Sequence, residues 1–235
     1  MNLKRIIMFM KLSIFAFIFF VLCYYITESL KSHAAYVREP FTKDCRHVQQ
    51  NLKKLITLAQ LVHDALEEKR FSHFLTYGSI WGPLRGYKGP LPWDNDVDFG
   101  TVITESTFCN IAPLLALLQD RGVAHQNHIE SAGLVRFCYA NETHAGRKTV
   151  DLFLYQPTAF GLARRVGYEF WLLTLHYYLH HSFPFRFVKG DLEKVEFAGR
   201  RIQIPRDGIE IMKYLYRYDW WTVKKPKNYN CTINP

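Results

Sequence analysis

The fold is decided by two blocks of sequence, Tyr77-Gly78-Ser79-Ile80-Trp81-Gly82-Pro83-Leu84-Arg85 and Pro92-Trp93-Asp94-Asn95-Asp96-Val97-Asp98-Phe99. In the second block, Asp96 and Asp98 are alternate residues of a predicted strand over residues 96–102, so both side chains point to one face. Neighbouring carboxylates repel each other unless a cation lies between them, and hard oxygen ligands suit Mg²⁺ or Mn²⁺. The spacing therefore predicts a metal site on this strand.

A third acid stands in an apolar stretch further along the chain. Asp151 lies within Thr149-Val150-Asp151-Leu152-Phe153, which is typical of a strand. On a strand next to residues 96–102 it would complete a cluster with Asp96 and Asp98. The simpler interpretation, loop caps and surface charges, is the commoner one for an isolated Asp-x-Asp, so the acids need support from another motif.

The first block supplies that support. A strand over residues 71–77, then Gly78-Ser79, then a helix over residues 79–85 presents free backbone N–H groups to an anion. Gly78 allows close approach, and the Ser79 hydroxyl can bond a phosphate oxygen or cap the helix. Arg85 lies on the same helix and can contact phosphate through two N–H groups. A phosphate cradle beside an acidic strand indicates phosphoryl transfer.

Together the two blocks resemble the signature of the LicD and fukutin-type family, within the nucleotidyltransferase-fold superfamily. Its pattern is close to Y-G-[ST]-hydrophobic-hydrophobic-G-x-x-R, followed by P-W-D-D-D-hydrophobic-D. The chain matches this pattern at Tyr77, Gly78, Ser79, Gly82, Arg85, Pro92, Trp93, Asp94, Asp96 and Asp98. The strand around Asp151 resembles the third-acid strand of the family, and residues 204–220 resemble its closing region.

One position departs from the family pattern. Asn95 stands where the family often has a second Asp in the row. By alternation along the strand, Asn95 faces away from Asp96 and Asp98, so we expect metal binding to survive.

The resemblance implies an α/β (α+β) fold with a short, nucleotidyltransferase-like mixed sheet flanked by helices. It also implies a transferase that moves phosphocholine or an alditol phosphate from a CDP-linked donor to a glycan hydroxyl and releases CMP. The expected catalytic and metal-binding residues are Asp96, Asp98 and Asp151, the expected donor-phosphate residues are Gly78, Ser79 and Arg85, and the expected supporting residues are Asp94 and Trp93. The alternatives are a nucleotide-sugar glycosyltransferase and a non-catalytic member that binds glycans.

Composition supports a globular, basic protein. The chain has 235 residues, 49% of them hydrophobic and 22% charged, with a formal net charge of +9. The positive residues form short pairs, such as Arg164–Arg165 and Arg200–Arg201, rather than a long stripe with interleaved aromatics. Nucleic-acid binding is therefore not favoured, and most of the charge is expected on a solvated surface.

The N-terminal region predicts a membrane anchor. Lys4 and Arg5 precede an apolar run over residues 6–26 that is long enough to cross a bilayer. Charge before the run predicts a cytosolic tail (1–5), a signal-anchor (6–26), a stem (27–43) and a luminal catalytic domain (44–235), in the Golgi or ER membrane. A cleaved signal peptide is the alternative.

Two glycosylation sequons fit a luminal domain. They begin at Asn141 and Asn230, in Asn-Glu-Thr and Asn-Cys-Thr. Outside the anchor the cysteines are Cys45, Cys109, Cys138 and Cys231, and their three possible pairings stay open. The sequence contains no Cys-x-x-Cys spacing, so a cysteine-bound metal cluster is not favoured.

The remaining pattern predicts elements around the motifs. Further helices are expected over residues 44–70, 107–121, 168–181 and 207–218, a strand pair over 134–139 and 150–155, and a hairpin over 194–204. His176 and His180 share a face of one predicted helix, as zinc ligands do. No His-Glu-x-x-His motif accompanies them, so a zinc hydrolase is not favoured.

Overall fold

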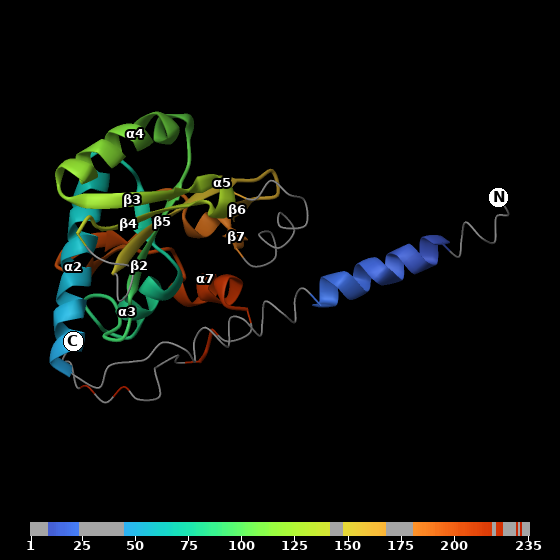
Figure 1. Cartoon of the computed structure of the whole chain (residues 1–235), viewed down its shortest axis with the longest axis horizontal. Coiled ribbons are helices and arrows are strands. Elements are labelled where there is room, and N and C mark those ends of the chain that lie inside the picture. The colour runs from blue at the N-terminus through green and yellow to red at the C-terminus, as the bar shows by residue number, and fades with distance from the viewer. Residues whose placement is uncertain are drawn as a thin grey trace. The chain divides into compact units, whose positions relative to one another are not determined.

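The structure, a computed structural model, describes residues 9–23, 45–141, 148–167, 181–217, 220–222, 229 and 231. Contacts divide the chain into two compact units, Met1–Thr42 and Lys43–Pro235. In the first unit, residues 9–23 form a helix whose side chains are almost all exposed (Figure 1). Among the described residues, none of the helices has the length and apolar character that a bilayer crossing requires. The predicted span over 6–26 includes residues 6–8 and 24–26, which lie outside the described residues, and the anchor stays a prediction.

The second unit is built on one mixed sheet. Its described strands are β1 (His73–Leu75), β2 (Asp96–Val102), β3 (Val123–His128), β4 (Leu134–Tyr139), β5 (Thr149–Pro157), β6 (Leu162–Arg165), β7 (Ser182–Pro184), β8 (Lys194–Phe197) and β9 (Arg200–Gln203). They run in the order β3-β4-β5-β2-β1-β9-β8, and β6 joins β5 to β7. The central pair β2–β5 is parallel, whereas β1–β2 and β4–β5 are antiparallel. The predicted mixed sheet is confirmed.

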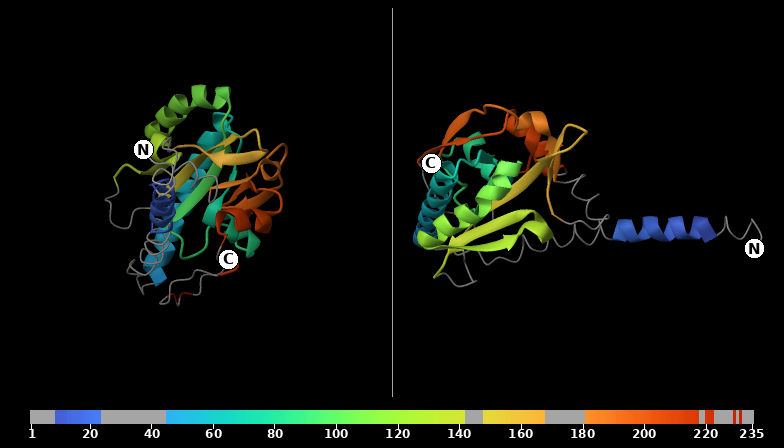
Figure 2. Two further views of the ribbon diagram at one scale, coloured as in Figure 1. Left: turned by 90° about the vertical axis from the view of Figure 1, so that its right-hand side faces the viewer. Right: turned by 90° about the horizontal axis from the view of Figure 1, so that it is seen from above.

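Helices cover both faces of this sheet. The described helices are α2 (Cys45–Glu68), η1 (Tyr77–Ile80), α3 (Trp81–Leu84), α4 (Glu105–Asp120), α5 (Ile129–Ala132), η2 (Phe185–Phe187) and α7 (Gly208–Leu215). The views of Figure 2 place α2 and α4 on one side of the sheet and α7 on the other. The predicted helix over 79–85 is instead a 3₁₀ turn followed by one α-helical turn. The predicted helix over 168–181 lies, except for residue 181, outside the described residues.

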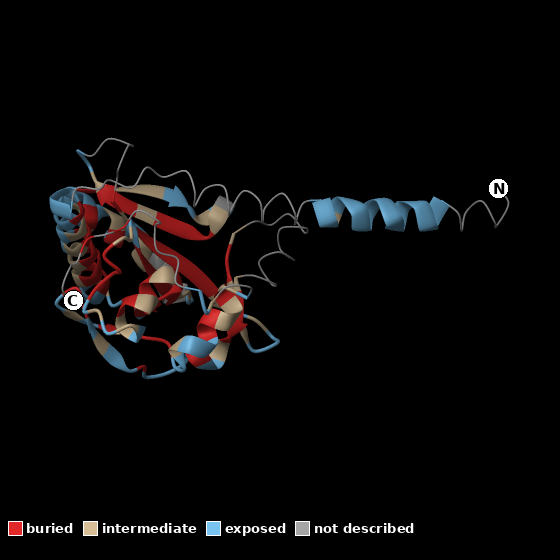
Figure 3. Ribbon diagram, turned by 90° about the horizontal axis from the view of Figure 1, so that it is seen from below, coloured by how far each residue is buried: buried red, intermediate tan, exposed pale blue. Residues whose placement is uncertain are grey.

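The core forms where the long helix α2 meets the sheet. Apolar residues recur along α2 at helical spacing, and Leu55, Leu58, Ala59 and Val62 are fully buried against the strands. Figure 3 shows the opposite side of α2 as exposed. Along β2 the pattern alternates, so that Val97 and Phe99 serve this core while the acids face the other side.

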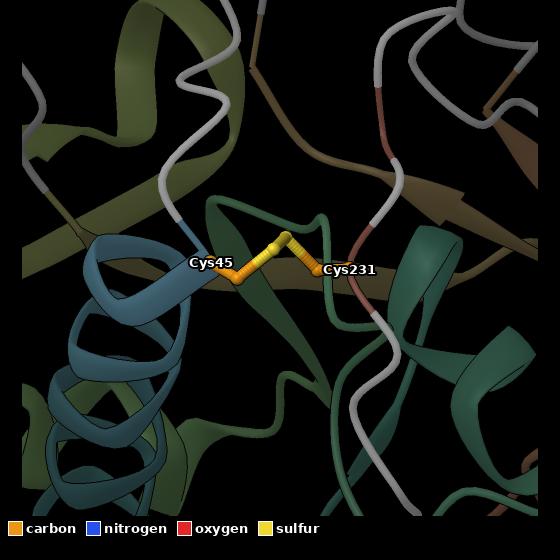
Figure 4. The surroundings of a disulfide bond; sticks show 2 residues. All are labelled: Cys45 and Cys231. Atoms are coloured by element: carbon orange, nitrogen blue, oxygen red, sulfur yellow. A yellow bond between two sulfur atoms is a disulfide. The ribbon is translucent and has the colours of Figure 1, made fainter.

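A disulfide joins the beginning and the end of the second unit. Cys45, at the start of α2, is bonded to Cys231, 186 residues further along the chain (Figure 4). Cys138, on β4, lies outside this disulfide as a buried thiol whose Sγ contacts the Ala124 carbonyl oxygen at 3.7 Å. Of the pairings that the sequence left open, this one ties the C-terminal tail to the first helix of the domain.

Candidate active site

The three acids predicted from sequence come together at the amino ends of two neighbouring parallel strands. Asp98 of β2 and Asp151 of β5 are direct partners in the register, and Asp96 is opposite Thr149. Adjacent strands lie about 4.8 Å apart, and residues two apart on one strand share a face. The predicted neighbouring strand for Asp151 is therefore confirmed.

The glycine-serine bend lies directly against these acids. The Asp98 amide donates a hydrogen bond of 2.7 Å to the Ser79 hydroxyl oxygen, and the Thr76 amide donates one of 3.0 Å to the Asp98 carbonyl. A Cβ atom added to Gly78 would lie 3.9 Å from Asp98 Oδ2. The bend thus faces the carboxylates, and Ser79 is buried as a tether between bend and strand. Its own hydroxyl hydrogen remains available to a ligand.

Tyr77, which opens the bend, is held in an unusual conformation. Its φ of 44° lies in the left-handed region that side chains other than glycine rarely adopt. Its ring packs 4.6 Å from that of Phe153, and its hydroxyl lies 3.0 Å from His181 Nδ1 and 3.4 Å from Arg165 Nη1. These contacts stabilise a strained residue beside the acids, which is a frequent property of functional sites.

The acids repel one another. Asp98 is 8% exposed, and burial together with the charges of Asp96, Asp151 and Asp94 raises its pKa well above the usual range. The pKa of Asp96 is raised by desolvation and by the charge of Asp151. The Asp96 side chain is open to solvent, which weakens the first cause and leaves repulsion from Asp151 as the main one.

Asp94 and Arg85 form the edge of the site. Burial and the charge of Asp96 raise the pKa of Asp94 to about 7, while the Leu91 amide donates to Asp94 Oδ2 at 3.1 Å and the charge of Arg85 lowers the pKa. Arg85 lies near enough to Asp94 for their charges to interact, and its guanidinium carbon is 4.5 Å from the centre of the Trp81 ring. Arg85 thus lies near this acidic edge, where a phosphate contact stays a prediction.

The other predicted supporting residue, Trp93, is half-buried and contacts Tyr229. The ring of Trp93 packs edge-on against that of Tyr229, with centres 5.3 Å apart. Tyr229 is buried two residues before the disulfide at Cys231. Trp93 therefore links the segment before β2 to Tyr229, close in sequence to the disulfide.

Sequence reasoning missed two basic residues of this site. Arg136 on β4 is opposite Asp151 and forms a two-bond fork with it, Nε to Oδ1 at 2.8 Å and Nη2 to Oδ2 at 2.6 Å. Lys148, buried just before β5, donates to Asn95 Oδ1, and its charge lowers the pKa of Asp96 and Asp94. For Arg136, the signal that the sequence offered was a single arginine within an otherwise apolar predicted strand.

The C-terminal segment contributes one more polar group. Tyr216 is the first residue after α7, and a Cβ atom added to Gly78 would lie 3.9 Å from its hydroxyl oxygen. Burial and then the charge of Asp98 raise the Tyr216 pKa well above its usual range, so the phenol stays protonated. Tyr216 therefore offers a neutral hydrogen-bond donor at the acid cluster.

A second cluster of possible metal ligands lies within the described residues. One ligand atom from each of His63, Glu67 and His73 falls within 4.8 Å of the others. His73 Nδ1 donates to the Phe71 carbonyl at 2.8 Å, so Nε2 accepts the hydrogen of His63 Nδ1 at 2.7 Å. Glu67 approaches Nδ1 of His73, at 3.9 Å, rather than the nitrogen that faces His63. Hydrogen bonds thus occupy both ring nitrogens of His73 and Nδ1 of His63, and we interpret the histidines as a neutral, hydrogen-bonded pair rather than as metal ligands.

A hollow of the surface lies away from these acids. It has a volume of about 590 Å³ and is lined by Gln50, Lys53, Lys54, Thr57, Tyr139 and Asn141. None of the predicted catalytic residues lines it, so we assign the chemistry to the acid cluster. Asn141 is exposed in a turn, as a glycosylation acceptor must be, while Asn230 lies outside the described residues.

The donor set of the acid cluster fits a divalent metal ion. Asp96 and Asp98 offer carboxylate oxygens on one face, and their raised pKa values report repulsion that a cation would relieve. Such ligands suit Mg²⁺ or Mn²⁺. Asp151 gives one lone pair of each oxygen to Arg136, so a metal would meet its remaining lone pairs.

Comparison with known proteins identifies the family. No curated protein matches the chain. The family model described as LicD/FKTN/FKRP, nucleotidyltransferase domain, matches residues 70–207, more than half of the chain. This range contains the bend, the acids and both missed basic residues. The chain therefore belongs to the LicD/FKTN/FKRP family of nucleotidyltransferase domains.

Proposed function

We propose that this protein is a metal-dependent transferase that moves a phospho-alcohol group from a CDP-linked donor to a glycan hydroxyl and releases CMP. The group is phosphocholine or an alditol phosphate. The observation that carries the proposal is the register of Asp98 with Asp151, directly beside the Gly78–Ser79 bend. Family membership supports a transferase of this general type.

The residues of the site divide into groups with separate tasks. Asp96 and Asp98 would hold Mg²⁺ or Mn²⁺, with Asp151 as a further ligand or as the base that takes the proton of the attacking hydroxyl. Bound there, the metal ion would supply charge neutralisation for the phosphate of the leaving CMP. Gly78 admits the donor phosphates closely.

The donor also needs fixed hydrogen-bond donors and positive charge. The Ser79 hydroxyl can donate to a phosphate oxygen while it accepts from Asp98, and Arg85 supports the phosphates from the edge of the site. Trp93 and Asp94 support the loop that leads into β2. Holding donor and hydroxyl together provides most of the catalysis in phosphoryl transfer.

We place the catalytic domain in the lumen of the Golgi or ER, anchored by residues 6–26. The Cys45–Cys231 disulfide supports this location, since such bonds persist in oxidising compartments. Asn141, the exposed first residue of its sequon, supports the same location.

The test is a donor screen on the purified full-length chain. The chain is incubated with Mn²⁺, mixed glycans, and either CDP-choline, CDP-ribitol, UDP-sugars or GDP-sugars, and the released nucleotide is identified. Release of CMP that depends on glycan and metal is the expected result. Release of UDP or GDP would instead identify a nucleotide-sugar glycosyltransferase. No release, together with no Mn²⁺ binding by calorimetry, would identify a non-catalytic, glycan-binding member.

A further inference from the structure

The arginine on β4 is placed for more than an ion pair. Arg136 and Asp151 are opposed in the antiparallel register of β4 and β5, so both side chains rise from the same face as Asp98. The fork between them uses two of the five N–H groups of the guanidinium.

Burial of the two partners is strongly unequal. The side chain of Asp151 is 3% exposed, whereas that of Arg136 is 40% exposed. The carboxylate is thus closed off by the inner edge of the guanidinium, and the arginine extends from it towards solvent. N–H groups beyond the fork remain to bind an anion.

The charges around Arg136 define which anion suits it. The negative charges of Asp96 and Asp98 act on Arg136 as well as that of Asp151. Four neighbouring aspartates, including Asp94, would repel a diphosphate that approached without fixed positive charge. An arginine already oriented by a buried carboxylate loses little further freedom when it binds a phosphate.

We propose that Arg136 binds a donor phosphate in the transferase described above, with its inner edge held by Asp151 and its outer N–H groups on a phosphate oxygen. This inference rests on the proposed function and adds a residue to its donor site. It also gives Asp151 a second task, which is to orient Arg136.

The chain contains a matched control pair. Arg200 of β9 forms the same fork with Asp64 of α2, Nε to Oδ1 at 2.7 Å and Nη2 to Oδ2 at 2.7 Å. Its carboxylate side chain is 41% exposed, and the pair lies outside the acid cluster. Arg200→Gln therefore removes an equivalent fork without touching the site.

The experiment uses calorimetry on the full chain. Binding of inorganic pyrophosphate and of CDP is measured in the presence of saturating Mn²⁺, and binding of Mn²⁺ is measured separately without either probe. Arg136→Gln is expected to weaken both phosphate probes by on the order of 10- to 100-fold, the usual effect of a lost charge-assisted contact. Arg136→Lys keeps the charge and falls between. Mn²⁺ alone should bind Arg136→Gln no more weakly than wild type, since a positive charge has left. Arg200→Gln should match wild type throughout.

Unchanged pyrophosphate affinity in Arg136→Gln would overturn the inference. Parallel weakening of Mn²⁺ and pyrophosphate would also overturn it, because Arg136 would then only hold Asp151 in place. If Arg136→Gln does not unfold cooperatively, the affinities of Arg136→Lys for pyrophosphate and for Mn²⁺ decide between the inference and a purely structural role. Wild type that binds pyrophosphate but neither binds CDP nor releases CMP contradicts the proposed function, and the pyrophosphate affinity of Arg136→Gln relative to wild type then still decides whether Arg136 binds phosphate. Wild type that binds neither probe overturns both.

Discussion

Two clusters of ionisable side chains lie on opposite faces of the same sheet, and they are built on opposite principles. On the face covered by α2, His63 and His73 form a chain of hydrogen bonds that ends at the Phe71 carbonyl. Burial lowers the pKa of His73 to about 4, so the pair is neutral. On the other face, Asp98 and Asp151 lie side by side, and burial together with the charges of the neighbouring acids raises the pKa of Asp98.

The histidine pair contributes to stability, whereas the acid cluster costs stability and is suited to binding a ligand. The histidines satisfy each other inside the protein and need no ligand. The acids keep unfavourable charge in close proximity, which lowers the stability of the empty site and is relieved by a bound cation. Arg136 and Lys148 offset part of this repulsion but do not remove it. Mutations in the two clusters should therefore have opposite effects on folding and activity.

The largest expected effect is on turnover at the acid cluster. Asp98→Asn should lower CMP release on the order of 10³-fold, since it removes a metal ligand. The same change should raise the unfolding free energy of the metal-free protein, because a buried, repelled carboxylate becomes neutral. Steady-state kinetics and chemical denaturation measure the two. The exposed Asp191→Asn is the control, and near-wild-type turnover in Asp98→Asn would end the metal assignment.

The histidine pair should show the reverse pattern. His73→Ala leaves a cavity and an unpaired Phe71 carbonyl, and should lower the unfolding free energy by about 3 kcal/mol. Turnover per folded molecule should stay near wild type, because the pair faces away from the acids. Denaturant titration beside the exposed His128→Ala, expected within about 0.5 kcal/mol of wild type, tests this. Stabilisation of wild type by Zn²⁺ that His73→Ala abolishes would show that the pair is a metal site after all.

The sequence predicted the part of the site that local motifs specify. Alternation placed Asp96 and Asp98 on one face, and helical spacing predicted α2, observed over Cys45–Glu68. β2, the β4–β5 pair and the hairpin of β8 and β9 were also predicted. Each depends on a periodicity that a short window contains.

Long-range register explains what was missed. The Arg136–Asp151 pair depends on how β4 and β5 align, and a shift of one residue would send Arg136 to the other face. The histidine pair joins a helix to a strand across a tight turn, which no periodicity encodes. β3, over Val123–His128, was missed because it is a polar, half-exposed edge strand without apolar alternation.

The pH dependence of folding should differ in sign between the two clusters. Asp94 has a folded pKa of about 7, above its ordinary value. Between about pH 4 and pH 7 its carboxyl therefore holds a proton in the folded protein that it has lost in the unfolded protein, so its contribution to stability falls as pH rises through this range. His73 has a folded pKa of about 4, below its ordinary value, so its contribution rises with pH from about 4 to 6.5. Denaturation of the metal-free protein between these limits measures both. Asp94→Asn should make the stability rise more steeply with pH, and His73→Ala should flatten it; identical slopes in all three proteins would contradict the comparison.

The smallest effect is expected where the chain departs from its family. Asn95 accepts a hydrogen bond from buried Lys148, whose positive charge lowers the pKa of Asp96. Asn95→Asp would pair that lysine with a carboxylate, so Lys148 would offset less of the repulsion at Asp96 and the metal would bind slightly more tightly. We expect kcat/KM for the CDP donor to change by no more than about threefold, or about 0.7 kcal/mol, because the side-chain oxygen of Asn95 is held by Lys148. A loss of 100-fold or more would mean that Asn95 itself contacts the donor, and the alternation that separates the two faces of β2 would then not extend to the residue before the strand.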